Sequence, residues 1–171
     1  SSRQAKFCRG RRARNVQIDP WQVKVAAVLT MAFDERTSVG IISDTHGYVD
    51  PFLHEAFVDC VGIVHAGDIG RVEVLEELEQ IAPVYAVKGN IDGGELRYLP
   101  LTRVDDFADK RVAALHIAGD ARRPKRAALE LIRTERPDVI VVGHTHVPVV
   151  GRVEGTLWVN PGAAGSEGHH Q

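Results

Sequence analysis

Hydrophobic residues along this chain follow two patterns, short runs typical of strands and longer stretches with helical spacing. Four short apolar runs, at residues 39–43, 61–65, 84–87 and 139–142, are typical of buried β-strands. Two segments between the first three runs place apolar residues on one helix face: Leu53, Ala56, Phe57 and Cys60, then Val74, Leu75, Leu78 and Ile81. This alternation of strands and short helices predicts right-handed crossovers and a parallel sheet.

Turn and cap residues indicate where the helices begin and end. Asp50 followed by Pro51 is typical of a helix start, because proline fits the first helical position. The second helix is expected over residues 71–82. A third is expected over about residues 124–135, and Pro137 ends it.

Antiparallel hairpins follow the helical region. Residues 102–107 and 111–117 flank a short polar turn and predict one hairpin, and residues 147–153 with 156–159 predict another. Parallel strands with helices, followed by hairpins, favour two sheets packed face to face. The predicted fold class is α/β, a four-layer αββα sandwich of two mixed β-sheets flanked by helices.

A chain of 171 residues suits one folded domain with extensions. Residues 1–36 are interpreted as a basic N-terminal extension, poorly ordered or loosely docked, and residues 37–165 as the domain. Residues 23–29 could form an added strand or helix, because periodicity does not decide between them. The start superficially resembles a signal peptide, but charged residues and a proline interrupt the pattern. Residues 166–171 resemble a purification-tag remnant.

The formal net charge of −2 hides an uneven distribution. Residues 1–36 carry eight Lys and Arg against three Asp and Glu, a balance of +5, so the remainder carries −7. An acidic body is not typical of a nucleic-acid binder, so we do not expect nucleic acid as a partner.

The cysteine content and the apolar runs indicate the compartment. Cys8 and Cys60 do not make a disulfide framework, which favours a reducing cytoplasm. No apolar run reaches the roughly 18 residues of a membrane span. We therefore expect a cytoplasmic protein without membrane contact, and the sequence leaves homo-oligomerisation open.

Polar side chains suited to metal binding follow five of the hydrophobic runs. They are Asp44, His46, Asp68, Asn90, His116, His144 and His146. Ligands of open α/β sheets bind at the carboxyl ends of the strands. Seven nitrogen and oxygen donors exceed the needs of one ion and suit two ions that share a carboxylate, as in two-metal phosphatase sites. Cysteine, which structural zinc sites prefer, is absent from the set.

Each of these residues also has a plainer explanation. Asp and Asn commonly act as caps and turn residues, and a lone histidine such as His116 can be a hydrogen-bonded core residue. Asp92 could orient a ligand or phosphate, or only shape a turn, and His65 could support Asp68. A basic cluster could bind substrate phosphate or form a solvated helix face: Arg122, Arg123, Lys125 and Arg126.

The order of the motifs resembles the calcineurin-like metallophosphoesterases, whose blocks are D-x-H, G-D, G-N, H and G-H-x-H. Here the blocks are Asp44-Thr45-His46, Gly67-Asp68, Gly89-Asn90, His116 and Gly143-His144-Thr145-His146. Smaller details, such as Asn160-Pro161-Gly162, are similar to the small single-domain bacterial and archaeal phosphodiesterases of this superfamily, and Asn160-Pro161-Gly162 could shape the metal pocket from behind. The resemblance covers residues 38–165.

The resemblance implies a dinuclear phosphoesterase acting on a small phosphoester. One metal would bind Asp44, His46 and His146, the other would bind Asn90, His116 and His144, and Asp68 would bridge them. A metal-bridging hydroxide would attack phosphorus, with Asp68, Asn90 and His116 as the residues expected to act in catalysis. Divalent Mn is the expected cofactor, with Ni, Fe and Zn as alternatives.

Two departures from the family pattern shape the expected chemistry. Larger members have a histidine, read as a general acid, where this chain has Ile91, so we expect slow turnover on poor leaving groups and better turnover of aryl phosphodiesters. His116 is followed by Ile117-Ala118 where relatives have glycine. A non-catalytic protein-binding scaffold, like the retromer subunit of this fold, is the alternative function, although that subunit lacks some ligands that this chain keeps.

Overall fold

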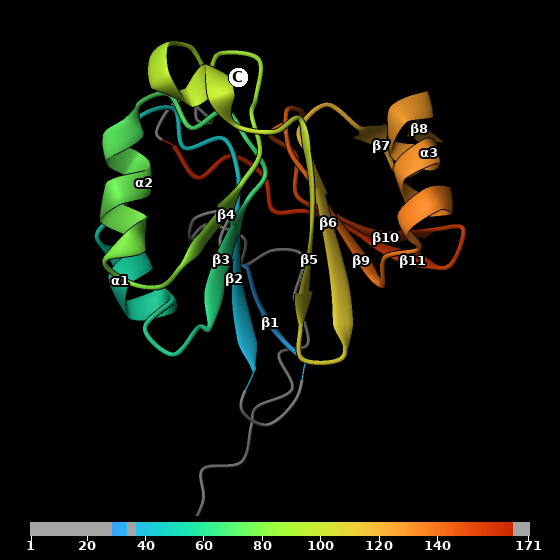
Figure 1. The fold of residues 1–171 in the computed structure, drawn as a ribbon, viewed down its shortest axis with the longest axis horizontal. Coiled ribbons are helices and arrows are strands. Elements are labelled where there is room, and N and C mark those ends of the chain that lie inside the picture. The colour runs from blue at the N-terminus through green and yellow to red at the C-terminus, as the bar shows by residue number, and fades with distance from the viewer. Residues whose placement is uncertain (1–28, 34–36, 166–171) are drawn as a thin grey trace, which may run out of the picture.

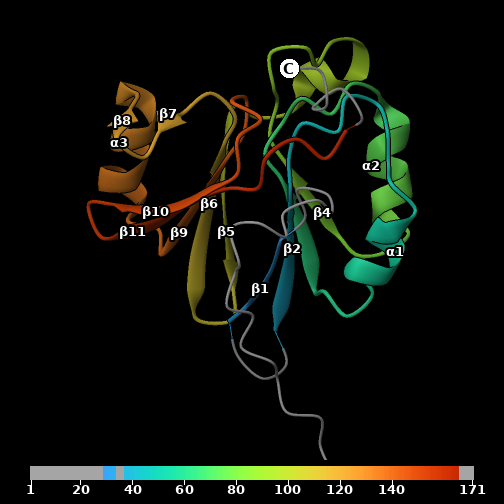
Figure 2. The same ribbon diagram turned by 180° about the vertical axis from the view of Figure 1, so that it is seen from behind.

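Two β-sheets lie face to face in the computed structural model, which describes residues 29–33 and 37–165, and helices cover both outer sides (Figures 1 and 2). The first sheet has the order β1-β2-β3-β4. β1 is antiparallel to β2, and the other neighbours are parallel. The strands are β1 (Leu29–Ala32), β2 (Ser38–Ile42), β3 (Gly62–His65) and β4 (Val84–Ala86).

The second sheet has five strands in the order β10-β11-β9-β6-β5. The two outer pairs are antiparallel hairpins, and the inner pairs are parallel. Its strands are β5 (Thr102–Phe107), β6 (Lys110–Leu115), β9 (Val139–Val142), β10 (Val149–Val153) and β11 (Thr156–Asn160). A small ribbon of β7 (Gly119–Asp120) and β8 (Arg123–Pro124) follows β6.

Helices α1 (Phe52–Ala56) and α2 (Val72–Glu79) lie on the outer side of the first sheet, and α3 (Arg126–Glu135) lies on the outer side of the second (Figure 1). A 3₁₀ helix, η1 (Gly94–Tyr98), follows β4. The layers therefore run helix, sheet, sheet, helix, and the predicted αββα sandwich of two mixed sheets is confirmed.

Alternation along the strands divides the core into layers. Val139 and Val141 of β9 pack between the two sheets, whereas Ile140 and Val142 pack beneath α3. Successive side chains of a strand point to opposite faces, so a strand covered on both faces must be apolar throughout. This explains why the run at residues 139–142 is continuously hydrophobic.

Half of the residues on the predicted helix faces are buried (Leu53, Phe57, Val74 and Leu78) and the other half are partly buried, and the helices are shorter than expected. α1 ends at Ala56 because a turn follows, in which the Cys60 N–H donates to the Phe57 carbonyl at 2.9 Å. Phe57 is buried against Gly40 of β2, where a Cβ would lie 2.7 Å from its ring. The Asp50 carboxylate accepts from the Phe52 N–H at 2.9 Å, as the start signal predicts.

Sheet pairing begins at Leu29, upstream of residue 37, where the predicted domain starts. β1 lies within the segment assigned to the basic extension, yet it pairs with β2 from Leu29 opposite Ile41 to Ala32 opposite Ser38. The pairing covers the outer edge of β2, which the sequence pattern of β1 alone did not reveal. Residues 1–28 and 166–171, including most of the predicted extension and the predicted tag remnant, lie outside the described residues. Among the described helices, none is long and apolar enough to cross a membrane.

Candidate metal centre

The loops that follow β2, β3, β4, β6 and β9 meet at one edge of the two sheets, the upper edge in Figure 1. These loops carry all seven residues predicted as metal ligands. Six of them form two groups, in each of which one nitrogen or oxygen atom per residue lies within 4.8 Å of the others: Asp44, His46 and His146, and Asp68, His116 and His144. Each group combines loops of both sheets, so the centre straddles the sandwich.

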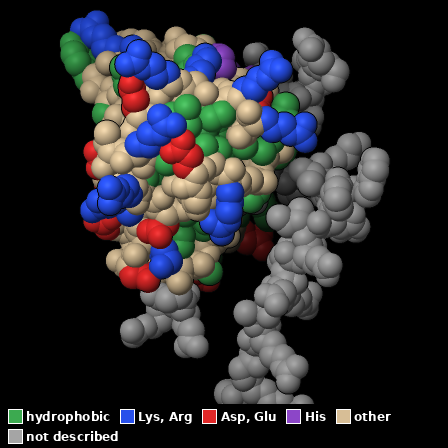
Figure 3. Space-filling model, turned by 90° about the vertical axis from the view of Figure 1, so that its right-hand side faces the viewer, with side chains coloured by type: hydrophobic (Ala, Val, Ile, Leu, Met, Phe, Trp, Pro, Cys, Tyr) green, Lys and Arg blue, Asp and Glu red, His purple; other side chains and the backbone are tan. Residues whose placement is uncertain are grey.

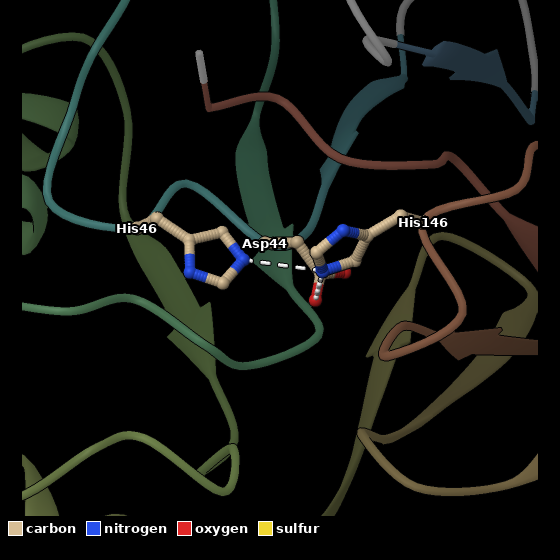
Figure 4. Close-up of side chains that lie close together, drawn as sticks. All are labelled: Asp44, His46 and His146. Atoms are coloured by element: carbon tan, nitrogen blue, oxygen red, sulfur yellow. Dashed lines mark hydrogen bonds and ion pairs between the residues drawn. The ribbon is translucent and has the colours of Figure 1, made fainter. Parts of the chain in front are cut away.

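The first group is shown in Figure 4. His146 reaches across from the second sheet to the loop that follows β2. Its Nε2 lies 3.2 Å from Nε2 of His46 and 3.2 Å from Oδ1 of Asp44. Two imidazole nitrogens and a carboxylate oxygen thus point toward one small volume, an arrangement that suits a divalent transition metal.

Asp44 is fully buried, and no lysine or arginine of the described residues pairs with it. The Ser43 hydroxyl donates to its Oδ2 at 2.6 Å, and the His144 N–H donates to both oxygens at 3.2 and 3.3 Å. Burial raises the pKa of this carboxyl, although the Ser43 hydrogen bond and the nearby His116 and His146 oppose the rise. A buried carboxylate is stabilised by a bound cation, so the charge balance here fits a metal site.

Asn90 completes the second group, although it is an amide. Its Oδ1 lies 3.1 Å from Nε2 of His116 and 2.9 Å from Nδ1 of His144. Oδ1 of Asp68 lies 3.2 Å from Nε2 of His116. Four side chains from four loops therefore turn their nitrogen and oxygen atoms toward each other.

The tautomer of His116 is set by its surroundings. Its Nδ1 lies 2.7 Å from the carbonyl oxygen of Ala66, which cannot donate, so Nδ1 carries the proton. Its Nε2 faces oxygens of Asp68 and Asn90 at 3.2 and 3.1 Å. A backbone carbonyl that accepts from the other ring nitrogen in this way is typical of metal-bound histidine. These donor atoms therefore suit a bound cation better than a purely structural role for His116.

Five of the seven residues have a left-handed backbone, with φ between 49° and 71°: Asp44, His46, Asp68, His144 and His146. This region costs a residue with a Cβ roughly 1–2 kcal/mol. Backbone hydrogen bonds hold the conformation, because the Asp44 N–H donates to the Gly67 carbonyl at 2.9 Å and the His46 N–H to the Asp68 carbonyl at 3.1 Å. Strain of this kind gathers at functional sites.

His65 links the first two loops of the centre from below. The Gly67 N–H donates to its Nδ1 at 3.2 Å, so its proton is on Nε2 and donates to the Thr45 hydroxyl at 3.0 Å. That hydroxyl donates to the Ile69 carbonyl at 3.1 Å. Complete burial, with repulsion from His116 and His46, lowers the pKa of His65 to about 3. The predicted supporting role fits these contacts.

Asp92 and Asn160 brace the loops from within. Asp92 is buried and accepts from the Gly70 N–H at 2.9 Å and from the Gly89 N–H at 2.7 Å, so it shapes two turns. The Asn160 amide donates to the Gly143 carbonyl at 3.1 Å and to the Thr145 hydroxyl at 3.0 Å. These contacts match the interpretation of Asp92 as a residue that shapes a turn, and not the interpretation that it orients a ligand or phosphate.

Close backbone approach explains the glycine beside several motif residues. A Cβ on Gly89 would lie 2.1 Å from Oδ1 of Asp68, and one on Gly143 would lie 2.1 Å from the Ser43 hydroxyl. No side chain fits at either distance. Sequence reasoning noted these glycines but missed Ser43, whose only signal is its place before Asp44.

The basic cluster after β6 is not brought to the centre by any contact in the described residues. Arg122, Arg123, Lys125 and Arg126 are all exposed, and Arg126 pairs with Glu130 at 2.6 Å. Figure 3 shows Asp and Glu side chains among the Lys and Arg on the face that carries α3. The contacts thus favour the solvated helix face over a phosphate site.

A scan against family models matches residues 38–171 to the calcineurin-like phosphoesterase superfamily domain. The chain belongs to the calcineurin-like phosphoesterase superfamily. Its members include small archaeal and bacterial metallophosphoesterases, and the similarity to these confirms the predicted family and subfamily. As a member, the chain is a metal-dependent hydrolase by family.

Relatives and solved structures agree with this membership. A "Probable metallophosphoesterase" of Methanothermobacter thermautotrophicus is 34% identical over 134 residues, covering 73% of this chain and 76% of the relative. The structure of an archaeal phosphodiesterase has a TM-score of 0.58 at 27% identity, covering 73% of this chain and 83% of that one. Vacuolar Protein Sorting 29 from Cryptosporidium parvum has a TM-score of 0.62 at 23% identity, with 74% of each chain covered, and is a likeness of fold alone.

Proposed function

We propose that this protein hydrolyses phosphodiester bonds of small substrates, with phosphomonoesters as a second substrate class, by means of two divalent metal ions. The observation that carries the proposal is the surroundings of His116 Nε2, which faces Asp68 and Asn90 oxygens at 3.2 and 3.1 Å with its proton on the other nitrogen. Nitrogen and oxygen donors that converge in this way suit a bound cation. Similarity to an archaeal phosphodiesterase supports the choice of diester.

The seven donors divide naturally between two ions. Asp44, His46 and His146 would hold one, Asn90, His116 and His144 would hold the other, and Asp68 would bridge them. Mn²⁺ is the proposed metal, with Ni, Fe and Zn as alternatives, because all accept imidazole and carboxylate ligands. Bound ions of this kind supply hydroxide at neutral pH and neutralise charge on the phosphoryl oxygens.

The protein's own residues hold the ligands in place and set their protonation. The Ala66 carbonyl keeps Nδ1 of His116 protonated, and Ser43 donates to Asp44, so each ligand presents a fixed donor atom. Residue 91, beside Asn90, is isoleucine and has no proton to give. The leaving alkoxide must therefore take its proton from water, which favours acidic leaving groups such as phenols.

A non-catalytic binding scaffold is the alternative function, since the fold is shared with Vacuolar Protein Sorting 29. The presence of all seven donors, with buried carboxylates and strained loops, supports an enzyme instead. A scaffold has no need of five residues in the left-handed region at one edge.

The test is to strip the full-length protein of metal and assay it on aryl phosphodiesters and aryl phosphomonoesters with Mn²⁺, Ni²⁺ or Zn²⁺ added back. We expect activity only with metal, and two bound ions per chain by elemental analysis. Asp68→Ala should abolish both metal uptake and turnover, whereas the exposed Asp59→Ala should leave both unchanged. Full activity in Asp68→Ala, or inactivity of the metal-loaded protein on every ester, would refute the proposal.

A further inference from the structure

A recess of about 340 Å³ adjoins the candidate metal centre. It lies between the start of α2 and η1, with walls that include Arg71, Val72, Ile91, Glu95 and Leu96. Its position is tied to the centre by the Ile91 N–H, which donates to Oδ1 of Asp68 at 3.1 Å. A group attached to a phosphoryl bound at the centre could therefore extend directly into this recess.

The recess is lined by three hydrophobic side chains, those of Val72, Ile91 and Leu96, together with three glycines and one charge of each sign. Ile91 is 46% exposed, and it directly follows Asn90. Arg71 and Glu95 lie in the same lining with opposite charges. An uncharged organic group suits such a lining better than a second phosphate, because the apolar wall cannot solvate added negative charge.

Arg71 lies where the recess meets the metal centre. Its Cγ and Cδ would be 3.7 Å from a Cβ placed on Gly47, the residue after His46. The aliphatic part of Arg71 therefore lies over the loop that carries two of the candidate ligands. Its Nε would be 3.8 Å from the same Cβ, so the start of the guanidinium also lies over this loop.

Arg71 also lacks a carboxylate partner among the described residues. Arg103, Arg126 and Arg133, in contrast, each lie 2.6 Å from an Asp or Glu oxygen. A guanidinium that is exposed and not engaged in an ion pair is available to an anionic oxygen, which it can bind through two N–H groups.

We propose that the recess binds the organic group of the phosphoester against Ile91, and that Arg71 binds a non-bridging phosphoryl oxygen at its mouth. This inference rests on the proposed phosphoesterase function and specifies its substrate class. Esters of aryl or similarly flat apolar alcohols are the preferred substrates, and esters of short alkyl alcohols are poorer ones.

The test compares phenylphosphonate with methylphosphonate, two non-hydrolysable anions that differ only in the organic group. Their dissociation constants are measured by calorimetry on the full-length protein loaded with Mn²⁺. Wild type should bind the phenyl compound about fivefold more tightly, and Ile91→Ala should remove that preference. Arg71→Ala should raise the dissociation constants of both compounds by about tenfold, without changing the ratio between the two constants.

Two control variants guard against a general loss of structure. Val147→Ala shortens another exposed apolar residue directly after a candidate ligand but outside the recess lining, and Arg122→Ala removes an exposed arginine elsewhere. Both should behave as wild type. Metal content, measured by elemental analysis, should be unchanged in all four variants.

The outcomes separate this inference from the proposed function. The recess alone is overturned if the wild type is active but Ile91→Ala keeps the preference for the phenyl compound. It is also overturned if Arg71→Ala binds both phosphonates as tightly as the wild type does. If the wild type hydrolyses no ester but binds phenylphosphonate through Ile91, the hydrolase function is refuted while the binding of an organic group in the recess is supported. If the metal-loaded protein binds neither phosphonate but still hydrolyses aryl esters, the recess alone is overturned; if it also hydrolyses no ester, both proposals are overturned.

Discussion

The buried imidazole of His65 should make the fold sensitive to mild acid. Its Nδ1 accepts from the Gly67 N–H and its Nε2 donates to Thr45, so the native structure holds the neutral ring and offers no acceptor to a second proton. Burial and the neighbouring histidines lower its pKa from 6.5 to about 3. The unfolded chain, in contrast, binds a proton near the ordinary value.

The direction and size of the effect follow from this difference. Because the folded pKa is depressed, the stabilising contribution is complete above about pH 6.5 and is lost progressively as the pH falls toward about 3. At about pH 5, roughly 1.5 pH units below the ordinary pKa, proton binding by the unfolded state alone lowers the free energy of unfolding by about 2 kcal/mol.

The assay is urea denaturation of the metal-free protein at about pH 7.5 and about pH 5, for wild type and His65→Gln. Glutamine cannot titrate, so the free energy of unfolding should fall by about 2 kcal/mol less in the variant than in wild type. His54→Gln is the matched control, because His54 is half-exposed and bonded to Glu77 at 3.4 Å. Parallel losses of stability in wild type and His65→Gln would refute a neutral, buried His65.

Two further predictions concern the bracing of the loops. Asp92→Ala leaves the N–H groups of Gly70 and Gly89 without their acceptor. The free energy of unfolding, measured in urea, should therefore fall by about 2–4 kcal/mol. An effect no larger than that of the exposed Asp59→Ala would contradict this prediction. Gly89→Ala places a Cβ 2.1 Å from Oδ1 of Asp68 and should abolish Mn²⁺ binding measured by calorimetry. Gly93→Ala, where a Cβ meets nothing within 4 Å, should bind Mn²⁺ normally, and equal binding by both variants would show that the close approach at Gly89 is unimportant.

Local patterns predicted most of the fold. The run at residues 139–142 and the helix faces of Leu53 with Phe57 and of Val74 with Leu78 are properties of neighbouring residues, and all are buried as expected. The sequence left residues 23–29 open as a strand or a helix, whereas β1 covers Leu29–Ala32, where pairing with β2 defines the strand. The ribbon of β7 and β8 has only two residues a strand, too few to show a period.

Sequence patterns alone predicted which residues gather at the candidate metal centre, because strands of a parallel sheet place the residues that follow them at one edge whatever the details of packing. Tertiary structure decided how these residues meet. The Nδ1 proton of His116 is placed by the carbonyl of Ala66, and Arg71, which lines the recess beside Ile91, lies over Gly47. Such contacts join residues 24 to 50 positions apart, so they are set by the packing of two sheets and not by any pattern along the chain.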